Sequence, residues 1–84
     1  MKYRVHIIRS AEEEIDRLPL SMNRRISHKI LSLEQKPRPR GSKKLSAREQ
    51  YRLRVGDYRI LYDIDDRNQV VTILAVGHRS EVYR

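Results

Sequence analysis

The stretch YRLRVGDYRILY, residues 51–62, constrains the fold of this chain more than any other part of it. Two runs that alternate apolar and polar residues, 51–55 and 58–62, meet across Gly56-Asp57. Glycine accepts the positive φ that a primed turn requires, so a Gly-X pair between alternating runs predicts a two-residue type II′ hairpin. Counting outward from the turn predicts four facing pairs: Val55 with Tyr58, Arg54 with Arg59, Leu53 with Ile60, and Tyr51 with Tyr62.

This register divides the hairpin into an apolar face and a basic face. Successive side chains of a strand point to opposite sides, so Arg52, Arg54 and Arg59 share one face. Like charges directly opposite each other destabilise a sheet, and breaches of such a local rule are expected at functional sites. The alternative is an ordinary solvated face, although such faces usually mix both signs of charge. The three arginines are therefore the first candidate site residues.

Length and composition narrow the class of protein. The 84 residues suffice for one small core, so we expect a single domain over residues 1–84. Cysteine is absent, and His6, His28 and His78 lie far apart without metal-ligand spacing, so we expect no metal and no cofactor. The longest apolar stretch, 70–76, is too short to span a bilayer and no signal-peptide pattern is present, which predicts a cytoplasmic protein without membrane association. A formal net charge of +8 and a pI near 10.3 indicate a polyanionic partner, with nucleic acid the first candidate.

The N-terminal half predicts one strand followed by a helical hairpin. Alternation over residues 2–8 indicates the strand. A capping box at residues 10–13 starts a short helix that Pro19 ends, and Ser21 can cap a second helix that Pro37 ends. The apolar residues of both helices keep helical spacing and would cover one side of a sheet: Ala11, Ile15, Leu18, Met22, Ile26, Ile30 and Leu33.

Residues 37–44 are predicted to form a loop, because they are too rich in Pro and Gly for regular structure. They belong to the most basic part of the chain, since from Lys36 to Arg54 there are eight Lys or Arg and one acid, Glu49. A flexible basic loop beside an arginine face suits contact with a phosphate backbone, the alternative being a solubilising linker. Phosphate contacts are therefore predicted for Arg38, Arg40, Lys43, Lys44 and Arg48.

A last strand over residues 69–79 would complete a three-stranded antiparallel meander. It is apolar on both faces, as expected of a central strand. Its register depends on the loop before it: an odd-numbered loop places Ala75 opposite Arg59 and brings Arg79 to the arginine face, whereas an even loop brings His78 there. The predicted fold is α+β, with an N-terminal strand, a helical hairpin and the meander forming a four-stranded sheet with two helices packed on one face.

Two sequences of the C-terminal half, YRLRVGDYRILY and VVTILAVGHRSEVYR, resemble the RelE toxins of the RelE/ParE toxin–antitoxin superfamily. The G-x-R element followed by EVY is distinctive in combination with the tyrosine-rich strand, and the order of elements upstream is also similar. The resemblance implies a RelE-like fold, similar to that of small microbial ribonucleases. It also implies a type II toxin that inhibits translation by cutting messenger RNA in the ribosomal A site. In that family the 2′-hydroxyl of the RNA is the nucleophile, and no metal is required.

By motif position, the resemblance implies catalytic roles for Arg52, Arg54, Arg59, Arg79 and Tyr83. A preorganised guanidinium cluster stabilises the negative charge that builds on the phosphate oxygens, and Arg59 and Arg79 are the candidates for this role. Tyr83 could stack on a base or position the 2′-hydroxyl. Relatives carry lysines where this chain has Arg52 and Arg54, and arginine is a poor proton acceptor. His78 is therefore a candidate for proton transfer.

The resemblance implies partners as well. These are a cognate RelB-like antitoxin that covers the toxin with an acidic or amphipathic segment, the ribosomal A site and mRNA. Two other functions stay open, namely a ParE-like inhibitor of DNA gyrase and a non-catalytic RNA- or ribosome-binding module.

Overall fold

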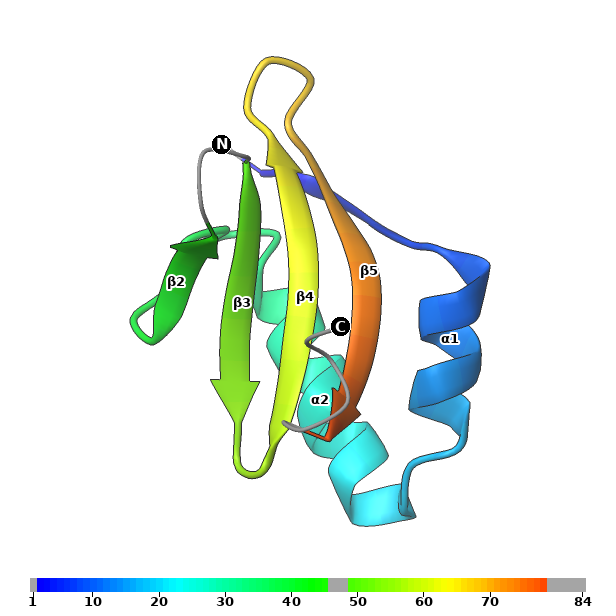
Figure 1. The fold of residues 1–84 in the computed structure, drawn as a ribbon. Coiled ribbons are helices and arrows are strands. Elements are labelled where there is room, and N and C mark those ends of the chain that lie inside the picture. The colour runs from blue at the N-terminus through cyan, green and yellow to red at the C-terminus, as the bar shows by residue number, and fades with distance from the viewer. Residues whose placement is uncertain (1, 46–48, 79–84) are drawn as a thin grey trace.

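The computed structural model describes residues 2–45 and 49–78, which form two helices and five strands (Figure 1). The elements are β1 Arg4–Ile7, α1 Arg9–Asp16, α2 Leu20–Ser32, β2 Ser42–Leu45, β3 Gln50–Val55, β4 Tyr58–Asp65 and β5 Val70–His78. The predicted α+β class is confirmed, with the predicted strand, helical hairpin and meander in their predicted order.

The strands form one mixed sheet in the order β1-β5-β4-β3-β2. β1 runs parallel to β5, and the other neighbouring strands are antiparallel. The predicted sheet of four strands is one strand short, because part of the segment predicted as a loop forms β2. The side chains of β2, SKKL, show no apolar alternation, and its place in the sheet comes from backbone pairing with the edge of β3.

The hairpin of β3 and β4 has the predicted register in all four pairs. Gly56 has a φ of 59°, while Asp57 keeps a negative φ, which fits a type II′ turn. The predicted apolar face is the one that meets the helices, since five of its six residues are at most 7% exposed: Tyr51, Leu53, Val55, Ile60 and Tyr62.

Both helices cover this apolar face of the sheet. Figure 1 shows α2 crossing behind the sheet and α1 lying beside β5. The predicted helical stripes are confirmed, since Ala11, Ile15, Ile26, Ile30 and Leu33 are buried in one core cluster with residues of β3, β4 and β5. The core thus fixes which sheet face remains open to a partner.

The predicted helix caps are wrong. Each helix begins two residues earlier than predicted, so Ser10 and Ser21 lie inside the first turns, and neither helix has a side-chain cap hydrogen bond at its N-terminus. A side-chain hydrogen bond that was not predicted connects the two helices. The Nδ2 atom of Asn23 in α2 donates to the Ile15 carbonyl at 3.0 Å, and this carbonyl also accepts from the Leu18 N–H at 3.1 Å, so the last turn of α1 is bonded to α2.

The register of β5 departs from the predicted count because of a bulge. Four residues, 66–69, connect β4 to β5, and an even loop with uninterrupted pairing would bring His78 to the arginine face. A register shift just beyond Leu61 instead places Gly77 opposite Arg59. His78 pairs with Tyr58 and lies on the other face, so the expected consequence of an even loop is wrong.

Candidate nucleic-acid interface

Four basic residues gather on the sheet face that points away from the helices, at the end nearest the hairpin turn. Arg54 of β3 lies directly opposite Arg59 of β4. In the next row, Lys43 of β2 lies directly opposite Arg52 of β3. Residues directly opposite on paired strands project from the same face, as do residues two apart on one strand. We call Lys43, Arg52, Arg54 and Arg59 the basic cluster.

The members of the basic cluster differ in their exposure to solvent. Arg59 is buried, with 7% of its surface exposed, and Arg52 is half-buried, while Lys43 and Arg54 are exposed. A guanidinium stays protonated even when buried, and a lower local dielectric strengthens its attraction for an anion. Burial strengthens the attraction of Arg59 for an anion that reaches it, while Arg54 and Lys43 are accessible to a phosphate at the surface of the sheet.

An open groove runs along the basic cluster between β2 and the hairpin turn. Its lining contains three cationic side chains and no carboxylate: Gly41, Ser42, Lys43, Arg52, Arg54 and Gly56. A groove of this kind can hold a phosphate backbone, with the cations placed along its course.

Arg25 of α2 adds a further positive charge near the hairpin turn. A Cβ atom placed on Gly56 would lie 3.3 Å from the Nη1 atom of Arg25, so this guanidinium packs beside the turn. Nothing in the spacing of the sequence pointed to this contact, because the helix and the hairpin are far apart along the chain. Only the packing of α2 against the sheet brings the two together.

The same sheet face is acidic at its other end. Asp63 and Asp65 of β4 share the face of Arg59, because they lie at even spacings from it, and Asp66 follows in the turn. The face is therefore polarised, from basic at the hairpin turn to acidic at the β4–β5 turn. Arg38 and Arg67 lie at the same end as these carboxylates, so a polyanion would be attracted chiefly to the basic cluster at the hairpin end.

Arg38, a predicted phosphate contact, lies at the acidic end and not in the basic cluster. Its Nη1 and Nη2 atoms donate to the two carboxylate oxygens of Asp66 at 3.1 and 2.7 Å, and its Nε donates to the Tyr51 hydroxyl at 2.8 Å. The Tyr3 hydroxyl donates to the same carboxylate at 2.6 Å. The hydrogen bonds from Arg38 and then from Tyr3 lower the pKa of Asp66 to about 2. Arg38 thus ties the loop after α2 to the β4–β5 turn.

A buried tyrosine anchors the same loop a second time. The Tyr62 hydroxyl donates to the Pro37 carbonyl at 2.8 Å, and the ring stacks on Tyr51 with 5.9 Å between ring centroids. Burial of the phenol raises the pKa of Tyr62 to about 12. Together with Arg38, this bond fixes the point from which the chain enters β2 and presents Lys43.

The remaining predicted contacts are spread over other surfaces. Lys44 projects from the face opposite to Lys43 and its Nζ lies 3.1 Å from the Glu49 carboxylate. Arg40 is exposed in the loop before β2. The predicted site residues Arg48, Arg79 and Tyr83 lie outside the described residues.

His78, the predicted proton-transfer residue, is exposed at the end of β5. Its ring meets Tyr58 edge to face, with centroids 5.7 Å apart, on the sheet face opposite to the basic cluster. The structure therefore brings together three predicted arginines, Arg52, Arg54 and Arg59, with one predicted phosphate contact, and keeps His78 apart from them.

Comparison with known proteins decides the family. The model of the family described as "ParE toxin of type II toxin-antitoxin system, parDE" matches residues 5–83. The chain belongs to the RelE/ParE superfamily of type II toxins. The expected membership is thereby confirmed.

Solved structures of relatives share the fold of this toxin. A chain of the toxin–antitoxin complex RelBE2 from Mycobacterium tuberculosis is 30% identical with a TM-score of 0.82, over 94% of this toxin and 100% of that chain. A chain of the archaeal RelE–RelB complex from Pyrococcus horikoshii OT3 is 30% identical with a TM-score of 0.83, over 98% of this toxin and 100% of that chain. Toxin RelG of Mycobacterium tuberculosis is 55% identical over 31 residues, which make up 37% of this toxin and 36% of that protein.

The chemistry available to the basic cluster of this toxin follows from its residue types. Guanidinium groups donate two parallel hydrogen bonds to a phosphate and hold a fixed positive charge near it. They do not accept protons near neutral pH, so the cluster can bind and polarise a phosphate but cannot act as a general base.

In the described part of this toxin, neither helix has the length and apolar character needed to cross a membrane.

Proposed function

We propose that this toxin is a ribosome-dependent endoribonuclease that cuts messenger RNA in the ribosomal A site through attack by the RNA 2′-hydroxyl. The observation that carries the proposal is the direct pairing of Arg54 with Arg59 on the open sheet face. This pairing is unfavourable for the fold and becomes favourable when an anion lies between the two charges. The membership of the RelE/ParE superfamily and the likeness to RelE toxins support the choice of RNA as that anion.

In this mechanism the basic cluster grips the scissile phosphate. Arg59 and Arg79 stabilise the charge that develops on the non-bridging oxygens, while Arg52 and Arg54 hold the phosphate in line for attack. Lys43 contacts the neighbouring phosphate along the groove. Tyr83 stacks on a base or positions the 2′-hydroxyl. We assign no general base, because arginine cannot fill this role and His78 lies on the other face.

The test is cleavage of mRNA on programmed ribosomes, with the new RNA ends mapped by primer extension. The wild-type toxin should produce ends inside codons, and Arg54→Ala and Arg59→Ala should each lower the rate by about 100-fold or more. Arg67→Ala is the matched control, because Arg67 is an exposed arginine in the turn at the acidic end. Circular dichroism would show that each variant is folded. Full cleavage by both cluster variants would refute the assigned site.

A second candidate function is inhibition of DNA gyrase, which the ParE description of the matching family favours. In that case the basic cluster would contact DNA or the enzyme without cutting RNA. A supercoiling assay separates the two. Blocked supercoiling together with intact mRNA on programmed ribosomes would establish the gyrase target and exclude the ribonuclease.

We also propose that a cognate antitoxin of the RelB type covers this toxin. Structures of two relatives are described as toxin–antitoxin or RelE–RelB complexes. An acidic or amphipathic antitoxin segment would be attracted to the basic cluster. Co-expression with the product of an adjacent reading frame should yield a complex that is weakened by Arg54→Glu and unaffected by Arg67→Glu. The proposed activity is cytoplasmic, since its target is the translating ribosome.

A further inference from the structure

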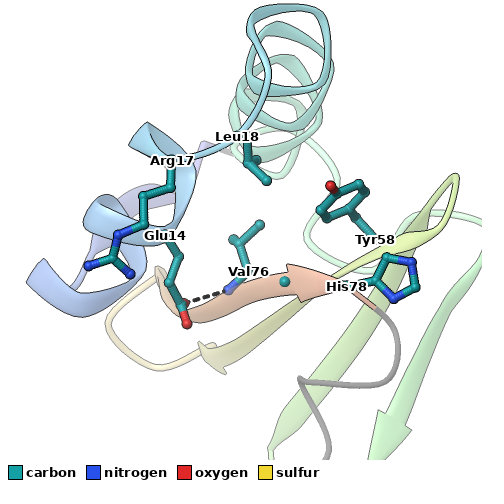
Figure 2. Close-up of a pocket in the computed structure, with 7 residues that line it drawn as sticks. Glu14, Arg17, Leu18, Tyr58, Val76 and His78 are labelled. Atoms are coloured by element: carbon teal, nitrogen blue, oxygen red, sulfur yellow. Dashed lines mark hydrogen bonds between the residues drawn. The ribbon is translucent and has the colours of Figure 1, made fainter.

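One glutamate of α1 reaches across to the backbone of β5. The Oε1 atom of Glu14 accepts a hydrogen bond from the Val76 N–H at 2.9 Å, a contact that is partly buried (Figure 2). It lies in a cleft between α1 and the ends of β4 and β5, lined by Glu14, Arg17, Leu18, Tyr58, Val76, Gly77 and His78. Figure 2 shows the Glu14 carboxylate pointing to β5, with Leu18 and Tyr58 on the far side of the cleft.

The strand pairing explains why the Val76 N–H needs this acceptor. β1 pairs with β5 only from Val70 to Ile73, and the Ile8 N–H makes the last backbone bond on that side, to the Ile73 carbonyl at 3.2 Å. The chain then turns into α1, and among residues 2–45 and 49–78 no strand pairs with the rest of β5 on its outer edge. Unpaired edge N–H groups are open to water and to other strands. Glu14 takes the place of the missing strand at this point.

The anchored part of β5 belongs to the proposed active site. Gly77, the next residue after Val76, lies directly opposite Arg59. Two positions further along the chain comes Arg79, which is proposed to stabilise the developing charge. Pairing with β4 holds the inner edge of this strand end, and the bond at Val76 holds its outer edge, next to the residue that faces Arg59.

We propose that Glu14 is a positioning residue for RNA cleavage, which holds the end of β5 in register through the Val76 N–H. This inference rests on the proposed ribonuclease function. A carboxylate that accepts from a backbone N–H makes one of the stronger hydrogen bonds of a protein, because the acceptor is charged. Glu14 does not touch the RNA and acts only through the strand that it holds.

Amide hydrogen exchange tests the anchor without any activity measurement. Glu14→Ala should speed exchange at Val76 and Gly77 by about tenfold or more, because an edge N–H without its charged acceptor opens more readily. Glu14→Gln keeps an uncharged acceptor oxygen in place, and its exchange rates should fall between those of Glu14→Ala and the wild type. Glu12→Ala is the matched control, since Glu12 is an exposed glutamate of the same helix. Unchanged exchange in Glu14→Ala would overturn the anchor, whatever the toxin does to RNA.

Cleavage kinetics test the functional part of the proposal. Glu14→Ala should lower kcat by about tenfold with KM near the wild-type value, because the phosphate grip on β2, β3 and β4 is untouched while the alignment at β5 is lost. Glu14→Gln should restore most of kcat, and Glu12→Ala should match the wild type. A melting curve shows whether each variant is folded. If Glu14→Ala does not fold, Glu14→Asp replaces it, because the shorter side chain cannot reach the Val76 N–H.

The outcomes separate the two proposals. Faster exchange with an unchanged kcat, or a rise in KM alone, would overturn the positioning role while leaving the ribonuclease in place. A wild-type toxin that leaves ribosomal mRNA intact would overturn the ribonuclease and the positioning role with it. In that case the exchange data would still decide whether Glu14 anchors β5.

Discussion

Replacing Arg54 with glutamine is expected to stabilise the fold of this toxin while weakening the proposed cleavage of RNA. Arg54 and Arg59 lie directly opposite each other in the hairpin, and Arg59 is buried. Two unit charges about 6 Å apart repel by roughly 0.7 kcal/mol at the dielectric constant of water, and by more in a less polar surrounding. Measured cross-strand pairs span about 0.2–1 kcal/mol. We therefore expect the free energy of unfolding to rise by about 0.5 kcal/mol, or the Tm by about 2–4 °C in a domain of this size.

Urea unfolding followed by circular dichroism, at low and at high salt, measures this gain. It should shrink at about 1 M salt, where the Debye length falls to about 3 Å. Arg67→Gln is the matched control, because it removes the same formal charge from the total of +8. The pKa of Asp65 is lowered mainly by hydrogen bonds from Asn68 and in part by the charge of Arg67, so Arg67 sits in a favourable field. Its removal should give no gain in stability.

Two results would refute this reasoning. A lower stability of Arg54→Gln would mean that packing of the arginine outweighs its repulsion from Arg59. An equal gain in both variants would mean that total charge, and not the facing pair, is the source of the cost. Either result would show that repulsion between Arg54 and Arg59 does not destabilise the fold, so a bound anion would have no such repulsion to relieve.

Three further predictions concern the core, a buried hydroxyl and an ionised carboxylate. Ile26→Ala should lower the free energy of unfolding by about 2–5 kcal/mol in a urea titration, because Ile26 has no exposed surface; Leu20→Ala, at a position that is 67% exposed, should change it little. Tyr62→Phe removes the donor to the Pro37 carbonyl and should lower the stability by about 1 kcal/mol, seen as a fall in Tm of about 4–8 °C, and an unchanged Tm would contradict the anchoring role. The folded-state pKa of Asp66, about 2, lies below its unfolded value, so ionised Asp66 stabilises the fold above roughly pH 4 and this stabilisation is lost as the pH falls through about 2. Acid titrations of the wild type and Asp66→Asn should therefore differ near neutral pH and converge at low pH; curves with a constant offset would contradict the linkage.

The hairpin and its arginine face could be read from the sequence because their determinants are local. A glycine that accepts positive φ lies between two alternating runs, and the period of two then assigns Arg52, Arg54 and Arg59 to one face by counting. The helical stripes were equally local, since apolar spacing decides which side of each helix meets the sheet. The family resemblance added the role of these residues and not their geometry.

The features that sequence reasoning missed depend on contacts between distant segments. β2 carries no apolar alternation, so only the open edge of β3 makes it a strand and brings Lys43 beside Arg52. The bulge beyond Leu61 leaves no local mark, because β5 is apolar on both faces and tolerates either register. The bond from the Val76 N–H to Glu14 also has no local signal, because it depends on where β1 stops pairing with β5.

The parallel pairing of β1 with β5 has a consequence for how the toxin is made. Arg4–Ile7 finds its partner only at Val70–Ile73, so almost all of the described chain must be synthesised before the sheet can close. Contacts of such long range delay folding, because the intervening chain has to be ordered first, and an isolated two-stranded hairpin is at best marginally stable in water. We therefore expect the basic cluster to reach its folded geometry only after most of the described chain has been added.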